Sequence, residues 1–266
     1  MTVNNLHREL APVSEAAWKD LEGEVRSTFT ANVAGRRVVD VAEPGGYKLS
    51  AVGTGHVAEL ASSEDGLLSQ LRTVQPIVEL RVPFVVSRQA VDDVERGAPD
   101  PDWDPAREAA KRIAFAEDRA IFDGWEDARI GGVRPESTNA PITLPSDVRE
   151  LPTAVAHGLG ELRLAGVDGP YALVLSADLY TEVTETSDHG YPIHAHLSRV
   201  VDDIVWAPAL TGAALLSTRG GDYTLRLGQD LSIGYLAHDA TTITLYLQET
   251  LTFIVDTAEA AVALNS

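Results

Sequence analysis

The strongest constraint on the fold lies near the C-terminal end, where apolar and polar side chains alternate along 241–247. The two faces of this run carry Ile243, Leu245 and Leu247 on one side and Thr242, Thr244 and Tyr246 on the other. Alternation with a period of two is typical of a strand with one buried face. The neighbouring segments 228–235 and 249–253 also favour strands. Together these segments predict two or three adjacent strands of one sheet.

An amphipathic helix is predicted near the N-terminal end. Ser14 can cap its first turn, and Glu15 suits the positive end of the helix dipole. Apolar side chains then recur at intervals of three and four, which is the spacing of one helix face. This apolar stripe consists of Trp18, Leu21, Val25 and Phe29. The pattern ends at 32–35, and the segment 37–41 is predicted to be a short strand.

The segment 44–86 predicts a long hairpin arm. It opens with a Pro-Gly-Gly turn signal at 44–46. The strand-forming runs that follow are 47–52, 56–60, 67–74 and 77–86, and 62–66 separates two of them. A two-stranded arm has little core of its own, so it needs a partner surface on which to settle. We therefore expect an arm that leads into a buried strand.

The rest of the chain mixes helices and strands. A short helix is expected over 87–96 with Gly97 as its stop, and Asp104-Pro105 indicates the cap and first turn of a long helix reaching about Trp125. The Gly- and Pro-rich connection 126–145 indicates a boundary between subdomains. In the second unit we expect helices at 152–165, 177–185 and 193–201, strands at 171–175, 204–207, 213–217 and 223–227, and a polar loop at 186–192. The predicted fold class is therefore α+β.

Composition excludes several classes of protein. Hydrophobic residues make up 44% of the 266 residues, which is enough for a core, and no apolar run is long enough to span a membrane. Cysteine is absent, so disulfide and thiolate chemistry is excluded. The net charge of −19 opposes nucleic-acid binding and favours solubility. Because 1–10 has no apolar core, we expect no secretory signal and a cytoplasmic location.

No motif predicts catalysis or cofactor binding. The segment 53–58 formally matches a dinucleotide-binding fingerprint, but no helix of useful length follows it. His189, His194 and His196 are close in sequence, yet side chains two positions apart on a helix diverge, and no metal-binding pattern supports them. Neither a G-x-S-x-G elbow nor a P-loop occurs. We therefore expect no catalytic residue, no metal and no cofactor.

The adjacent Glu117 and Asp118 lie in the middle of the long predicted helix. Successive side chains of a helix point about 100° apart, so this pair is poorly arranged for catalysis by paired carboxylates. We predict instead that the two carboxylates form ion pairs with nearby arginines or across an interface.

Ordered sequence blocks run through nearly the whole chain. The blocks are 4–12 (NNLHRELAP), Trp18, 34–41 (AGRRVVDV), 92–97 (DDVERG), 116–121 (AEDRAI), 169–171 (GPY), 188–192 (DHGYP), 218–222 (TRGGD) and 228–235 (GQDLSIGY). In these blocks the chain resembles family 1, linocin-like encapsulin shell proteins of bacterial nanocompartments, which share the capsid fold of tailed phages. Many blocks in one order are more specific than any single block, and the connection 126–150 is the least distinctive part.

The resemblance implies a capsid-type subunit with a peripheral domain, an axial domain and an extended loop. It places the N-terminal helix and first peripheral strand at 1–43 and the extended loop at 44–73. The peripheral domain would continue over 74–137, the axial domain would span 138–223, and the C-terminal peripheral strands would occupy 224–266.

The resemblance also implies a function. About sixty copies of the chain would assemble into a closed icosahedral shell in the cytoplasm. The shell would enclose a cargo enzyme, a dye-decolorising peroxidase or a ferritin-like protein, recruited through the cargo's own C-terminal targeting peptide. The shell itself would not be an enzyme, and we expect neither nucleic acid nor a membrane as a partner. The alternatives are a phage-type capsid protein, which would hold DNA, and a secreted bacteriocin or protease-like activity.

Two sets of site residues follow from the resemblance. The set expected to bind the cargo peptide is Phe29, Val33, Arg36, Asp40, Asp230, Ile233 and Tyr235. The set expected to border a pore at the five-fold axis is Ser187, Asp188, His189, Gly190 and Tyr191. Both sets leave an alternative open. Phe29 and Val33 can simply pack the helix against the wall, and 187–191 can be an ordinary surface loop.

Overall fold

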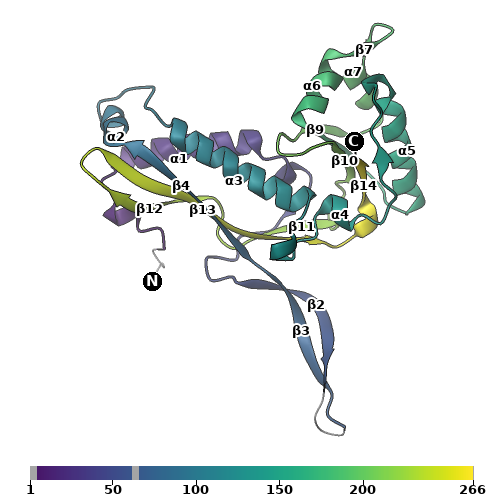
Figure 1. The fold of residues 1–266 in the computed structure, drawn as a ribbon, viewed down its shortest axis with the longest axis horizontal. Coiled ribbons are helices and arrows are strands. Elements are labelled where there is room, and N and C mark those ends of the chain that lie inside the picture. Colours follow the sequence, from purple (N-terminus) through teal and green to yellow (C-terminus); the bar gives the residue numbers. More distant parts are fainter. Residues whose placement is uncertain (1–4, 62–65, 266) are drawn as a thin grey trace.

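The structure, a computed structural model, describes residues 5–61 and 66–265. Within these residues the chain forms two five-stranded sheets and a long two-stranded arm that projects away from both (Figure 1). A short two-stranded hairpin also projects beyond the helices that surround the second sheet (Figure 1). The predicted break between the arm strands, 62–66, lies outside the described residues except for Gly66.

The first sheet is built around one long strand, β13 (Thr242–Val255). Strand β4 (Val78–Ser87) pairs antiparallel with one edge of β13. Strands β12 (Ser232–His238) and β11 (Tyr223–Leu227) pair antiparallel with its other edge. The short β1 (Asp40–Val41) adds in parallel to β11.

The predicted alternation is confirmed in β13. Ile243, Leu245 and Leu247 are fully buried there, and β13 pairs with an adjacent strand as predicted. That strand, β12, begins at Ser232 rather than at the predicted 228 and ends at His238 rather than at 235. The segment 249–253 continues β13 rather than forming a third strand. Tyr246, which the alternation places on the polar face, is only 2% exposed, so both faces of β13 are covered at this point.

Two long helices, α1 (Glu15–Asn32) and α3 (Asp104–Phe122), pack against each other and α3 packs on β4 and β13. The predicted cap of α1 is confirmed, because the Ser14 hydroxyl accepts a hydrogen bond from the N–H of Ala17 at 3.1 Å. The predicted stripe is also confirmed. Its four side chains are at most 9% exposed and share one hydrophobic cluster with the inner side chains of β12 and β13.

The ends of the neighbouring helices differ slightly from expectation. Helix α2 (Arg88–Glu95) ends before Gly97, whose φ of +84° suits glycine. Helix α3 begins with Asp104 in its first turn, and Trp103 rather than Asp104 occupies the N-cap position. The indole N–H of Trp103 donates to Asp20 at 2.7 Å and so ties the start of α3 to α1. α3 ends at Phe122, three residues before the predicted end.

The predicted hairpin arm consists of β2 (Ala51–Leu60) and β3 (Ser69–Pro76), paired antiparallel. The segment 53–58 lies within β2, where a register shift between Gly53 and Val57 accompanies the positive φ of Gly55. None of the described arm residues is buried. The large apolar side chains that the arm exposes are Val57, Leu60, Leu67, Leu68, Leu71 and Val74.

The second sheet has the strand order β5–β14–β10–β6–β9. Its strands are β5 (Ile142–Thr143), β6 (Tyr171–Leu175), β9 (Asp203–Trp206), β10 (Ala213–Ser217) and β14 (Ala261–Asn265). Every residue of β6 and β10 is buried, which confirms the predicted buried strand at 171–175. The larger helices around this sheet are α5 (Leu151–Leu164), α6 (Ala177–Glu185) and α7 (Ile193–Leu197). Short elements complete the fold: α4 (Val133–Glu136) and the 3₁₀ turns Arg8–Leu10, Gly35–Arg37, Glu126–Ala128, Val148–Glu150 and Ala258–Ala260.

Strand β14, which the resemblance groups with the C-terminal peripheral strands 224–266, pairs with β10 and β5 in the second sheet. Its four residues 261–264 are buried, so they fit the interior of that sheet. The predicted strand 37–41 is a strand only at 40–41, because a 3₁₀ turn occupies Gly35–Arg37. The predicted helix 193–201 ends at Leu197.

Candidate functional site

A hollow of about 530 Å³ lies between α1 and the segment 230–233 that leads into β12. Its lining consists of Leu6, Arg8, Glu22, Val25, Arg26, Phe29, Thr30, Val33, Arg36, Arg37, Asp230, Leu231, Ser232 and Ile233. Five of the seven residues predicted to bind a cargo peptide are in this set. They come from two segments about 200 positions apart, which the packing of α1 on the sheet brings together. We call this feature the α1 hollow.

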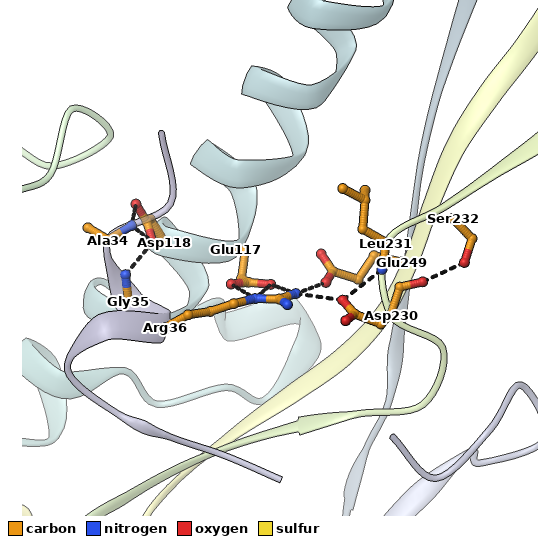
Figure 2. Close-up of polar contacts among 9 residues, drawn as sticks. All are labelled: Ala34, Gly35, Arg36, Glu117, Asp118, Asp230, Leu231, Ser232 and Glu249. Carbon is orange, nitrogen blue, oxygen red and sulfur yellow. Dashed lines mark hydrogen bonds and ion pairs between the residues drawn. The ribbon is translucent and has the colours of Figure 1, made fainter. Parts of the chain in front are cut away.

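Arg36 lines the α1 hollow and is held by three carboxylates (Figure 2). Its guanidinium donates to both oxygens of Glu117 at 2.7 to 3.1 Å, contacts Asp230 at 3.0 Å, and also pairs with Glu249. Burial opposes the charge of Arg36, but the hydrogen bond and charge of Glu117 and the charge of Glu249 outweigh burial and raise its pKa. Arg36 is therefore a fixed cation whose position α3 and β13 determine together.

Glu249 projects from β13 and is completely buried. Burial, followed by the nearby charge of Glu117, raises the pKa of the Glu249 carboxyl well above its ordinary value. One of its oxygens, Oε2, has no hydrogen-bond partner among residues 5–61 and 66–265. Arg36 thus faces three carboxyl groups, of which Glu117 and Glu249 are buried behind the lining of the hollow.

The two halves of the Glu117-Asp118 pair have different roles. The predicted ion pair with an arginine is confirmed for Glu117, which binds Arg36. For Asp118 the prediction is wrong within this chain, because its carboxylate accepts hydrogen bonds from the backbone N–H groups of Ala34 and Gly35 at 2.8 to 3.0 Å. Burial raises the pKa of Asp118 to about 7. Asp118 thereby shapes the turn that presents Arg36 to the hollow.

The predicted apolar contacts, Phe29 and Val33, have little free surface. Phe29 is 4% exposed and Val33 is 7% exposed, and both belong to the cluster that joins α1 to the sheet. The guanidinium of Arg36 covers one face of the Phe29 ring, 4.8 Å from its centroid. Within the chain, these side chains therefore mainly pack the helix, as the alternative interpretation held.

Asp40 and Tyr235 lie outside the α1 hollow. The carboxylate of Asp40 accepts a hydrogen bond from the N–H of Gly221 at 2.6 Å, in a smaller polar hollow beside β1. The hydroxyl of Tyr235 is 2.6 Å from Nδ1 of His238, farther along β12. Asp40 and Tyr235 therefore contact Gly221 and His238, and the structure does not bring them together with the five predicted residues that line the hollow.

The prediction missed several residues that line the α1 hollow. Glu22, Val25 and Arg26 precede Phe29 by three to seven positions, so helical spacing could have identified them. Leu6 and Arg8 could not be found in this way, because they precede the helix and reach the hollow only through tertiary contacts.

The predicted pore residues form a tight hairpin of β7 (Ser187–Asp188) and β8 (Tyr191–Pro192). The two turn residues, His189 and Gly190, have φ values of +47° and +84°. Two successive positive values are typical of a hairpin turn matched to the twist of its strands. Figure 1 shows this hairpin projecting beyond α6 and α7. The structure therefore keeps all five predicted residues on one projecting tip.

The histidines near this hairpin are dispersed. The His189 side chain is 97% exposed, 3.8 Å from Asp188. His196 instead packs edge-on against Tyr191, with ring centroids 4.5 Å apart. In the described part of the chain no three His, Cys, Asp or Glu side chains are grouped so that they could hold a metal ion.

Comparison with known proteins identifies the family. Residues 3–252 match a family described as "Encapsulating protein for peroxidase". The chain is 57% identical to the type 1 encapsulin shell protein of Mycobacterium tuberculosis, over 99% of this chain and 100% of that protein. The chain belongs to the type 1 encapsulin shell family. It is also 55% identical to the type 1 encapsulin shell protein of Brevibacterium linens, again over 99% and 100% of the two chains.

Solved structures show the fold of this encapsulin. A virus-like particle from Pyrococcus furiosus aligns with a TM-score of 0.63 at 15% identity, covering 93% of this chain and 98% of that one. A chain from Mycobacterium phage Bobi aligns with a TM-score of 0.59 at 16% identity, covering 88% and 90%. The predicted α+β capsid fold is therefore confirmed.

As an encapsulin, the protein is a structural subunit of a nanocompartment shell and not a catalyst, as the sequence predicted. Its family assignment rests on the full-length identity, because structural likeness at 15% identity is shared with phage capsids and shows the fold alone. Across the described residues, no helix is both long and apolar enough to cross a membrane.

Proposed function

We propose that this encapsulin shell encloses a dye-decolorising peroxidase whose C-terminal segment docks in the α1 hollow. The observation that carries the proposal is the convergence of α1 and the 230–233 segment on one hollow that a fixed cation, Arg36, lines. The family's description favours a peroxidase over a ferritin-like protein as the cargo.

The size and lining of the α1 hollow suit a short extended peptide. Its volume of about 530 Å³ lies in the range of small-ligand sites, so it can receive a few side chains but not a folded domain. Its wall runs from Glu22 to Val33, about three turns of α1, which gives it an elongated shape. Polar side chains recur every four positions along that wall, at Glu22, Arg26 and Thr30, so polar groups of a peptide find partners there.

The arm supports assembly with further copies of this chain. The described part of the arm exposes six large apolar side chains and buries none of its residues, and an isolated two-stranded ribbon is marginally stable in water. We propose that the arm settles on a neighbouring subunit and that about sixty subunits close the shell. We assign the first sheet with α1 and α3 to the peripheral domain and the second sheet with α5 to the axial domain.

The β7–β8 hairpin is our candidate for the border of a pore at the five-fold axis. It projects from the tip of the second unit, and its turn exposes His189 and Asp188, which are titratable groups. We further propose that the shell is cytoplasmic. The absence of cysteine supports this location, because the protein needs no oxidising compartment for its folding.

The docking proposal can be tested by filling the hollow from α1. Replacing Arg36 is unsuitable, because removing the cation would leave Glu117 and Glu249 buried without their partner and would destabilise the subunit. Thr30→Trp is better, since Thr30 is exposed and lines the hollow. The matched control is Ser27→Trp, which adds the same side chain at an exposed position of α1 outside the hollow.

Both variants should form shells of normal size when they are co-expressed with the peroxidase. We expect T30W shells to carry at least about tenfold less peroxidase than S27W shells, because a bulky side chain occupying a recognition pocket removes its main contacts. The measurement is the ratio of haem absorbance to protein absorbance in purified shells. Equal loading of the T30W and S27W shells would show that the cargo docks elsewhere.

A further inference from the structure

The N-terminal segment 5–8 forms one wall of the α1 hollow, and dedicated contacts hold it there. Leu6 and Arg8 line the hollow. On the sheet side, the N–H of Tyr235 donates to the carbonyl oxygen of Leu6 at 2.8 Å. This bond lies at the outer edge of β12, which is the last strand of its sheet. The segment therefore covers part of an otherwise open strand edge.

The side chain of Tyr246 makes a second connection to this wall. Its hydroxyl donates to the carbonyl oxygen of Asn5 at 3.1 Å. To reach Asn5, the ring lies across the partner position Gly234 in β12, where an added Cβ would come 2.1 Å from the ring carbon Cζ. Arg81 covers the same ring, with its guanidinium carbon 4.3 Å from the centroid. Gly234 thus makes room for a tyrosine whose hydroxyl reaches the N-terminal segment.

Further polar contacts attach the segment at both sides. The amide of Asn5 donates to Gln229 at 2.8 Å, and Gln229 also accepts from Gln248 of β13. Toward α1, Arg8 pairs with Glu22 at 2.5 Å and lies over the ring of Trp18, 4.2 Å from its centroid. The segment therefore bridges the helix and the sheet.

Leu6 differs from the other apolar residues of the hollow in its free surface. Phe29, Val33 and Ile233 are at most 7% exposed, so they have almost no surface left for a ligand. Leu6 is half-buried and belongs to neither hydrophobic cluster of the subunit. Leu231, on the opposite segment, is also half-buried. The apolar surface that the hollow offers to a ligand comes mainly from these two leucines.

We propose that Leu6 is an affinity-determining contact for the docked cargo segment, and that Tyr246, Gly234 and Asn5 position the wall that carries it. This inference rests on the proposed docking function and assigns the apolar contact to residues outside α1. The ligand it fits is an extended peptide segment with an apolar side chain that inserts beside Leu6.

The test uses the full shell and a fluorescent protein that ends in the last thirty or so residues of the peroxidase. Leu6→Ala should lower the fluorescence per shell about fivefold, because most of one buried leucine contact is lost. Leu6→Met should retain loading, because it conserves apolar volume. The matched control is Leu10→Ala, since Leu10 is 66% exposed two residues after this segment and does not line the hollow. It should load like the wild type.

A second variant tests the positioning role. Tyr246→Phe keeps the ring over Gly234 and removes only the bond to Asn5, so loading should fall about threefold while shell size and thermal stability stay unchanged. Loading of L6A equal to that of L10A would overturn the contact, and normal loading of Y246F would overturn the positioning role. If T30W empties the shell but L6A does not, this inference fails while the docking function stands. If T30W shells load normally, the docking function itself fails.

Discussion

The strand pairs β6–β10 and β2–β3 differ in what they bury. Every residue of β6 and β10 is buried, whereas no described residue of β2 and β3 is. Both pairs contain leucines and valines, so apolar content alone does not separate them. The difference is that α5, β14 and β9 of the same chain cover the first pair, and the described chain supplies no such cover for the arm. One subunit therefore completes its second sheet alone and leaves the apolar side chains of its arm uncovered.

The largest expected effect is obtained by removing the arm. Gly53 and Val74 are register partners, so 54–73 can be replaced by an Asn-Gly turn that joins them directly. We expect shell assembly to be lost, because the exposed apolar surface for a neighbour is gone. The subunit should stay folded, since the arm contributes nothing to either core. Size-exclusion chromatography with negative-stain microscopy and circular dichroism would measure both outcomes. Intact shells from this variant would show that assembly does not need the arm.

The opposite behaviour is expected for the second sheet. Leu173→Ala in β6 leaves a cavity in a fully buried site and should lower the free energy of unfolding by about 3 to 5 kcal/mol. Leu164→Ala is the control, because that side chain is 85% exposed at the end of α5 and should change the free energy by no more than about 0.5 kcal/mol. Both are measured by urea unfolding in the unassembled arm-deleted subunit. Similar values for the two variants would show that the second sheet is not self-sufficient.

A smaller effect is expected from pH at the junction of α1 and α3. The folded subunit holds the proton of Asp118 up to about pH 7, whereas the unfolded chain releases it near the ordinary value of 3.8. Between these values the folded state binds more protons, so stability decreases as the pH rises from about 4 to about 7 and shows no further decrease from this group above that range. Glu249, whose pKa is also raised, acts in the same direction.

Asp118→Asn in the arm-deleted subunit isolates this contribution. The amide oxygen can still accept from Ala34 and Gly35 but does not titrate. We expect the parent to lose about 2 to 3 kcal/mol of unfolding free energy between pH 4.5 and pH 7.5 more than the variant does. Parallel stability curves for the two proteins would contradict the raised pKa of Asp118.

The sequence alone predicted a helix or a strand correctly wherever the pattern within that one segment is distinctive. The stripe from Trp18 to Phe29 identified α1, the apolar run 171–175 identified a buried strand, and the Gly-bounded runs after Pro44 identified the arm. Ordered blocks such as 34–41 and 228–235 were sufficient for the family and the fold. Each of these inferences depends on side-chain period or on the order of residues along the chain, which the sequence contains directly.

Only the tertiary structure decided which distant groups meet. The pattern of β14 is that of any buried strand, and its partner β10 follows from how the chain turns at 258–260. Asp118 contacts backbone N–H groups more than 80 positions away, and the hydroxyl of Tyr246 reaches across Gly234 to Asn5, the neighbour of Leu6. Backbone donors and acceptors are alike in every residue except proline, so the sequence names no partner for them. Packing selects that partner, and with it the walls of the α1 hollow.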